Sequence, residues 1–108
     1  MENVGKIRLH QNAWVVAKLQ FTYLDGGKMI HTDGSPGVAL GNSVTLDPSE
    51  FGVPEGASVS AYIFVVWGND NHGKEIFTMV HGSPNIADYT LEGTTLGNTL
   101  TYNGMKQK

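Results

Sequence analysis

The stretch Trp14–Leu24 reads Trp-Val-Val-Ala-Lys-Leu-Gln-Phe-Thr-Tyr-Leu, and its side chains alternate in character. Every second residue on one side is apolar: Val15, Ala17, Leu19, Phe21 and Tyr23. The other side begins apolar and becomes polar: Trp14, Val16, Lys18, Gln20 and Thr22. A period of two is typical of a β-strand, and a single apolar face is typical of a strand that covers a core on one side. The stretch therefore predicts one strand of a half-exposed sheet.

The rest of the chain repeats this pattern between turn residues. Asp25-Gly26-Gly27 predicts a hairpin, and Asp47 followed by Pro48 predicts one helical turn. Further strands are predicted at Lys6–Leu9, Lys28–Thr32, Val38–Leu46, Ala57–Trp67, Lys74–Val80, Ile86–Glu92 and Thr99–Tyr102. Short strands at this spacing predict an all-β fold, an antiparallel β-sandwich of two packed sheets with about seven to eight strands. The tail Met105–Lys108 is expected to fray.

Composition limits the classes of function. The 108 residues predict a single domain over residues 1–108, and the net charge of -3 argues against nucleic acid as a partner. There is no Cys, so disulfides and thiolate chemistry are excluded. No apolar run is long enough for a membrane helix, and the N-terminus lacks the apolar segment of a signal peptide. These features leave the compartment undetermined.

Catalysis and metal binding find little support in the residues. No Ser lies in a Gly-x-Ser-x-Gly motif, and the four His have no metal-ligand spacing with one another. The segment Asn69–Gly73 resembles part of a calcium loop, but its Gly comes one position too early. We therefore predict a protein that is not an enzyme and that carries no metal and no cofactor.

A cluster of polar residues beside a Trp favours ligand binding instead. Trp67 stands next to Asn69, Asp70, Asn71 and His72. An exposed indole offers a flat apolar face to a sugar ring, and amides and carboxylates bond its hydroxyl groups. Two alternatives remain open: a polar hairpin loop without a ligand, and a Trp67 that plugs the end of the core.

The segment Gly93-Thr94-Thr95-Leu96 resembles a motif in the C-terminal domain of the cholesterol-dependent cytolysins. Other segments resemble that domain in the same order: Asn12–Ala17, Tyr23–Lys28, Ile76–Thr78 with Pro84, and Thr99–Asn103. The resemblance implies an elongated β-sandwich with loops clustered at one tip. The expected tip loops are Gln11–Trp14, Asp33–Gly37, Val66–Gly73 and Gly93–Gly97.

The resemblance also implies site residues. Thr95 and Leu96 match the pair that recognises sterol in the family, and Asn12 and Trp14 fall in the first tip loop. Members of the family touch membranes with this tip, and several bind glycans. The family's Trp-rich loop falls here at about Val66–Lys74, where one Trp remains among polar residues. Burying those polar groups without partners costs about 1–3 kcal/mol each.

Three functions follow from these observations. The first is a lectin-like, carbohydrate-binding module that recognises a glycan or a cell-surface glycoconjugate through the polar tip. The second is a membrane or sterol recognition module without pore-forming parts, which uses Thr95 and Leu96. The third is a toxin-associated structural domain that forms a homo-oligomer through Trp14 and Trp67. The resemblance predicts that Trp67–His72 and Thr95–Leu96 meet at one end, with Asn12 close by.

Overall fold

The structure, a computed structural model that describes residues 1–107, consists almost entirely of β-strands. The strands are β1 (Asn3–Val4), β2 (Lys6–Ala13), β3 (Ala17–Asp25), β4 (Lys28–His31), β5 (Ser43–Leu46), β6 (Ser58–Val65), β7 (Asn71–His72), β8 (Phe77–Met79), β9 (Asn85–Gly93) and β10 (Asn98–Gln107). The one helical element in the described residues is the 3-10 turn η1 (Pro48–Phe51), capped by the Asp47 side chain as predicted.

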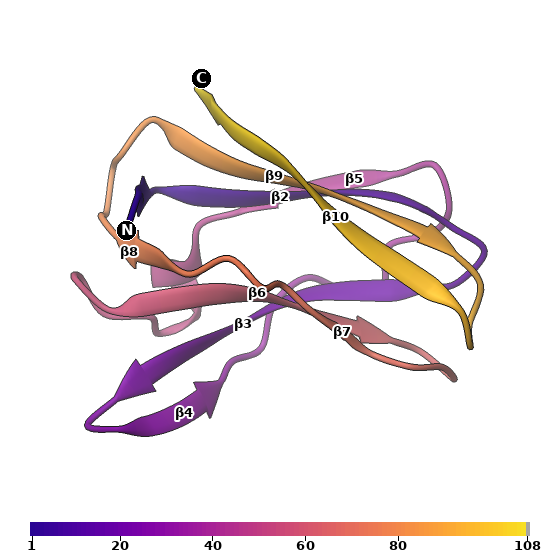
Figure 1. Cartoon of the computed structure of the whole chain (residues 1–108), viewed down its shortest axis with the longest axis horizontal. Coiled ribbons are helices and arrows are strands. Elements are labelled where there is room, and N and C mark those ends of the chain that lie inside the picture. Colours follow the sequence, from indigo (N-terminus) through magenta and orange to yellow (C-terminus); the bar gives the residue numbers. More distant parts are fainter. Residues whose placement is uncertain (108) are drawn as a thin grey trace.

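The strands form two packed sheets, so the all-β sandwich prediction is confirmed (Figure 1). One sheet has the order β1-β8-β6-β3-β4, with β7 paired to β6, and the other has the order β10-β9-β2-β5. The two sheets hold six and four strands, slightly more than predicted. The prediction of purely antiparallel sheets is wrong at two pairs, because β1 pairs with β8 and β2 with β9 in parallel. Alternation along a strand specifies its faces and carries no signal about the direction of a distant neighbour.

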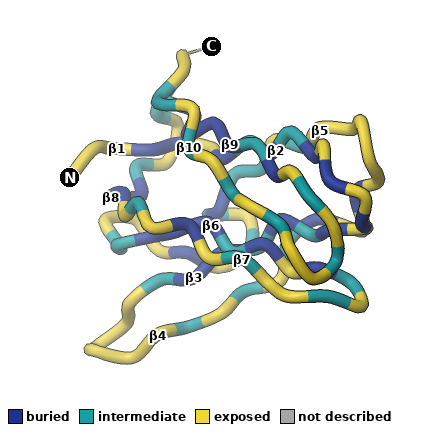
Figure 2. The backbone as a smooth tube through the Cα atoms, turned by 45° about the vertical axis from the view of Figure 1, so that its right-hand side comes forward, coloured by how far each residue is buried: buried dark blue, intermediate teal, exposed yellow. Residues whose placement is uncertain are grey.

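The core lies between the sheets and is built by the predicted alternation. Along β3, the inward residues Ala17, Leu19 and Phe21 are fully buried. Figure 2 shows buried segments along the inner strands of both sheets and an exposed β3–β4 hairpin. Inward positions of β2, β6 and β9 complete the core: Ile7, Leu9, Val59, Ala61, Ile63, Ala87, Tyr89 and Leu91.

Several boundaries differ from the predictions. The strand predicted at Val38–Leu46 is divided into an isolated bridge from Val38 to Ala17 and the strand β5, because the chain turns at Gly41, whose φ of 89° leaves the strand region. The strand predicted at Lys74–Val80 shortens to β8. The tail prediction is wrong for Met105–Gln107, which pair with β9; Lys108 lies outside the described residues. The observed strand boundaries depend on pairing with neighbouring strands and on the turn at Gly41. The polar tail forms a strand because β9 pairs with it, and the residues of the tail alone do not indicate that partner.

The outer face of the four-stranded sheet carries a buried carboxylate. The Asp88 carboxylate receives a hydrogen bond from Arg8 Nε at 2.5 Å, and one of its oxygens lies 2.9 Å from His10 Nε2. Its second oxygen accepts from the Asn103 amide at 3.1 Å. Burial alone would raise the pKa of Asp88, but the bonds from Arg8 and Asn103 and the nearby positive charges outweigh it and hold this pKa below 3.8.

The Asp88→Asn substitution should lower the free energy of unfolding by about 1–3 kcal/mol at neutral pH, because it removes a charged hydrogen-bond acceptor. A carboxyl whose pKa is depressed by folding stabilises the fold above its unfolded pKa, and this stabilisation is lost as pH falls through the folded pKa. We therefore expect the two proteins to converge in stability below about pH 4. Urea unfolding between pH 2 and pH 7 measures this, with the exposed Asp33→Asn as control. If the Asp88→Asn protein were less stable than the wild type by the same amount at pH 2 as at pH 7, the depressed pKa of Asp88 would be contradicted.

Candidate functional site

Connections from both sheets meet at one end of the sandwich, at the right of Figure 1. The Trp14 amide donates to the Gly93 carbonyl at 2.8 Å, which joins the β2–β3 and β9–β10 connections. The Asn69 amide donates to the Thr95 carbonyl at 2.9 Å, which joins the β6–β7 connection to the same place. The prediction that the Trp67 loop and the Thr95–Leu96 loop meet is thereby confirmed.

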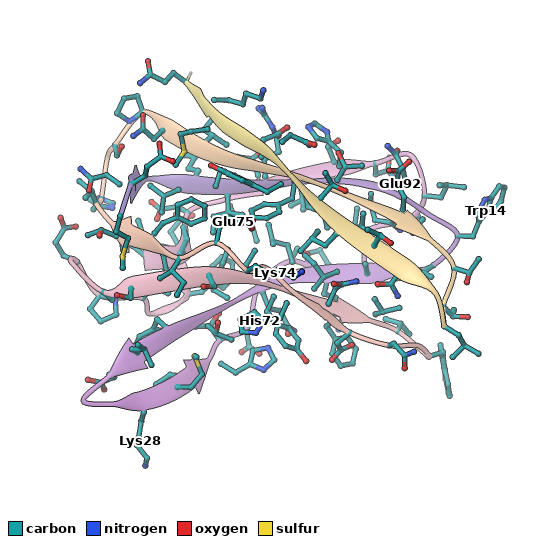
Figure 3. All side chains as sticks on the ribbon, viewed as in Figure 1. Trp14, Lys28, His72, Lys74, Glu75 and Glu92 are labelled. Atoms are coloured by element: carbon teal, nitrogen blue, oxygen red, sulfur yellow. The ribbon has the colours of Figure 1, made fainter. Side chains whose placement is uncertain are left out.

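Three large apolar side chains project from this end, and together they form the apolar tip: Trp14, Trp67 and Leu96. Their exposed fractions are 76%, 94% and 75%. Figure 3 shows Trp14 pointing away from the body of the molecule. The alternative of Trp67 as a core plug is therefore wrong, because the side chain is almost fully exposed.

A shallow groove of about 560 Å³ lies at the base of the apolar tip. Its lining is almost entirely carbon and comes from four connections: Trp14, Val15, Val16, Leu40, Val66, Trp67 and Thr95. Leu40 belongs to the loop before β5, which the sequence analysis did not include in the tip. The predicted tip loop Asp33–Gly37 runs instead along β3, where the Ser35 amide donates to the Leu19 carbonyl at 2.9 Å.

Trp67 adopts a backbone conformation that an L-residue rarely takes. Its φ is 63°, the one positive φ at a non-glycine residue among those described. The next residue, Gly68, lies so close to the other loop that a Cβ there would sit 2.3 Å from the Thr95 carbonyl oxygen. The left-handed conformation costs roughly 1 kcal/mol or more for a residue other than Gly. The fold thus holds a strained Trp whose ring is almost fully exposed.

The polar residues of the Trp67 loop are engaged within the protein. The Asp70 carboxylate accepts from the Val65 amide at 2.8 Å and from the Tyr62 hydroxyl at 2.5 Å. The second bond raises the pKa of Tyr62 to about 12, because the carboxylate stabilises the protonated phenol. The Asn69 side chain donates to the Leu96 carbonyl at 3.1 Å. These side chains shape the loop that carries Trp67.

Asn98 holds the two loops together and was not singled out from the sequence. Its side-chain amide donates to the Asn69 carbonyl at 2.9 Å and to the Thr94 carbonyl at 3.3 Å. Its oxygen atoms accept from the Asn71 side chain. An Asn after a Gly turn gives no signal of a partner more than 25 residues away, so only the topology identifies it.

One of the predicted site residues, His72, lies apart from the apolar tip, whereas Asn12 lies at the end of β2, two residues before Trp14. His72 belongs to β7, where its Nε2 lies 2.9 Å from the Thr22 hydroxyl on the outer face of the six-stranded sheet (Figure 3). Asn12 is an exposed residue of β2 opposite Glu92 of β9. The structure therefore separates His72 from Trp67, although only four residues lie between them in sequence.

Gln11 is a second residue that the sequence analysis missed. It is fully buried, and its amide donates to the carbonyls of Val15 at 2.6 Å and Val38 at 3.1 Å. Its side-chain oxygen accepts from the Ala13 amide at 2.6 Å. Gln11 thus fixes the turn that presents Trp14. Its position two residues after the buried Leu9, on the inward side of β2, is the signal that could have found it.

Within residues 1–107, no three or more His, Asp or Glu side chains gather as a metal site would require. No helix in the same range is long and apolar enough to cross a membrane.

Comparison with known proteins identifies the fold. No protein-family model and no curated protein matches the sequence. Suilysin from Streptococcus suis matches with 16% identity and a TM-score of 0.56, over 96% of this chain and 24% of that chain. A disulfide-locked mutant of intermedilysin with human CD59 matches with 12% identity and a TM-score of 0.52, over 94% and 24% of the two chains. The membrane-binding domain of pneumolysin matches with 15% identity and a TM-score of 0.45, over 96% and 98%.

The matches to suilysin and intermedilysin confirm the resemblance to cholesterol-dependent cytolysins at the level of the fold. The present chain spans about a quarter of the length of the full toxins that it matches.

Proposed function

We propose that this chain is a membrane-surface binding module whose apolar tip enters the interfacial layer of a bilayer. The observation that carries the proposal is the clustering of Trp14, Trp67 and Leu96 at one end, each at least three-quarters exposed. Contiguous exposed apolar side chains mark interaction sites. Trp side chains favour the interface between water and hydrocarbon, where the apolar ring is buried and the indole N–H stays near polar groups.

The energetics support a role of Trp67 in binding rather than in the stability of the fold. A ring that is 94% exposed contributes almost no burial to folding, while its backbone conformation costs stability. Moving such a side chain into an apolar environment contributes about 1.5–3 kcal/mol. Three side chains together are enough for reversible surface binding, and they are too few for a permanent anchor.

The polar loop residues are compatible with shallow insertion. Asn69 and Asp70 have hydrogen-bond partners inside the protein, so their polar groups approach the membrane partly satisfied. The desolvation cost that applies to unpartnered polar groups is correspondingly smaller. Thr95 lines the groove and Leu96 is 75% exposed, so the pair that matches the family's sterol-recognition residues would be accessible at the proposed contact.

Co-sedimentation with phosphatidylcholine vesicles, with and without cholesterol, tests the proposal. We expect the protein to pellet with vesicles, and its Trp emission to shift to shorter wavelength as the exposed indoles leave water. Stronger pelleting with cholesterol would support sterol recognition through Thr95 and Leu96. A protein that stays in the supernatant with both vesicle types, at lipid in large excess, would refute membrane binding.

Carbohydrate binding is a second candidate, favoured by the exposed indole face of Trp67. A sugar ring would stack on that face, and the exposed side of the Asn69–Asp70 segment and Asn71 would bond its hydroxyls. The internal hydrogen bonds of these residues leave fewer free donors and acceptors than their number suggests. A glycan array probed with the intact chain tests this candidate, and binding to a glycan without binding to vesicles would place it first.

A further inference from the structure

The longest strand of the molecule has a free edge. β10 contains ten residues and, within residues 1–107, pairs only with β9, so no strand of the described residues lies along its other side (Figure 1). An unpaired strand edge presents a row of N–H and C=O groups that can template another strand. The remaining sheet edges are short: β1 has two residues, and β4 and β5 have four each.

The backbone groups that face this free edge can be assigned. The Gly93 carbonyl accepts from the Trp14 amide, so Gly93, and with it every second residue back along β9, points toward β2. Glu92 and Thr90 therefore bond to their β10 partners, Thr99 and Thr101. Leu100 and Tyr102 of β10, which alternate with these partners, direct their N–H and C=O groups away from β9. The Asn98 carbonyl has the same outward orientation, because it accepts a hydrogen bond from the Asn71 side chain, which lies outside this sheet.

Common devices against edge pairing are absent from this part of the strand. The segment 98–105 contains no charged residue and no Pro. A register shift between Tyr102 and Gly104 bends the strand only beyond the two free positions. Lys106 lies past that shift. The uncharged segment can therefore face an identical segment without repulsion between like charges.

We propose that β10 pairs antiparallel with β10 of a second copy of this chain, with Thr101 opposite Thr101 about a twofold axis. In this register Leu100 of one copy lies opposite Tyr102 of the other. Both residues direct their backbone groups outward, so the two opposed pairs form four backbone hydrogen bonds. The four-stranded sheets of the two copies become one continuous sheet.

The surroundings of the free edge provide room for the added strand. A polar cleft of about 360 Å³ lies beside Leu100, Thr101 and Tyr102, with the segment 71–75 as its other wall. The Tyr102 hydroxyl is buried and has no hydrogen-bond partner. The side chains of Leu100 and Tyr102 from the second copy would enter this cleft on the core side of the strand, next to the Tyr102 hydroxyl.

Sedimentation equilibrium between about 10 and 500 μM protein tests the proposal through two charge variants. Thr101 is exposed, so Thr101→Lys and Thr101→Glu should fold normally, while each places like charges opposite one another at the twofold axis. We expect the wild type to self-associate with concentration, each variant alone to associate at least 10-fold more weakly, and a 1:1 mixture of the two to recover association. Recovery by opposite charges identifies Thr101 as facing itself.

The matched control is Thr45→Lys, at an exposed position of β5 on the opposite edge of the same sheet, which should associate as the wild type does. A wild type that is monomeric throughout the range would overturn the proposal. So would variants that associate as strongly as the wild type, or a mixture that stays as weak as its components. The test uses no lipid, so its outcome is independent of the proposed membrane function.

Discussion

Replacing Trp67 with Asn should weaken binding to vesicles by about 10- to 150-fold and should leave the fold at least as stable as the wild type. The loss of affinity follows from removing a 94% exposed ring that would otherwise contribute about 1.5–3 kcal/mol in the interface. The stability follows from the φ of 63°, which Asn tolerates better than Trp does. We expect a gain of up to about 1 kcal/mol in the free energy of unfolding.

Two measurements check this prediction: vesicle co-sedimentation, and urea unfolding followed by circular dichroism. Met29→Asn is the control, because Met29 is 59% exposed in the β3–β4 hairpin, away from the apolar tip. It removes a comparable exposed apolar side chain and should leave vesicle binding unchanged. Equal losses for both variants would show that general surface hydrophobicity, and not the apolar tip, determines binding. A Trp67→Asn protein that binds as the wild type does would remove the basis of the proposed function.

The core of the fold could be predicted because burial and period coincide. Along β3 and β6, each inward residue is apolar, so the alternation in the sequence follows burial except at the buried outward residues Thr22 and Ser60. The hairpin at Asp25–Lys28 was also predictable, since Gly26 and Gly27 both adopt positive φ. Local sequence contains this information because each residue's neighbours two positions away share its face.

The direction and length of strands were less predictable for a physical reason. β9 lies parallel to β2, although some 70 residues separate them, and nothing in either segment specifies that partner. β10 continues to Gln107 because β9 provides a ladder for it, and not because its own residues are apolar. Pairing across long sequence separations overrides local propensity in such strands.

The polar loop shows the same limit at the candidate site. Asn69, Asp70 and Asn71 were interpreted from the sequence as ligand-binding groups, because side-chain amides and carboxylates suit sugar hydroxyls. In the structure they bond to Leu96, Val65 and Asn98, which lie on other parts of the loop or on a distant connection. Whether they also contact a ligand stays a prediction. What the residue types could not reveal is that internal partners already use much of their hydrogen-bonding capacity.

Gln11 leads to the second large effect, because it links the core to the apolar tip. It lies on the inward side of β2, where the alternating positions Ile7, Leu9 and Ala13 are apolar and fully buried. A polar residue at such a position requires hydrogen-bond partners. Its three bonds go to backbone groups of Ala13 and Val15, on either side of Trp14, and of Val38 in the connection between β4 and β5.

Gln11→Met should therefore lower the free energy of unfolding by at least about 2 kcal/mol, because the Ala13 amide and the Val15 carbonyl lose their partner at about 1–3 kcal/mol each, while the Val38 carbonyl keeps the Ala17 amide. Met has nearly the same length and adds no strain of its own, so the loss reports the missing hydrogen bonds. Urea unfolding followed by circular dichroism measures it. Gln107→Met is the matched control, since the exposed Gln107 makes one side-chain bond, to Asn85, and should change stability by less than about 0.5 kcal/mol. A Gln11→Met protein within about 1 kcal/mol of the wild type would mean that the turn rearranges to satisfy its own backbone, and that Trp14 is positioned without help from the core.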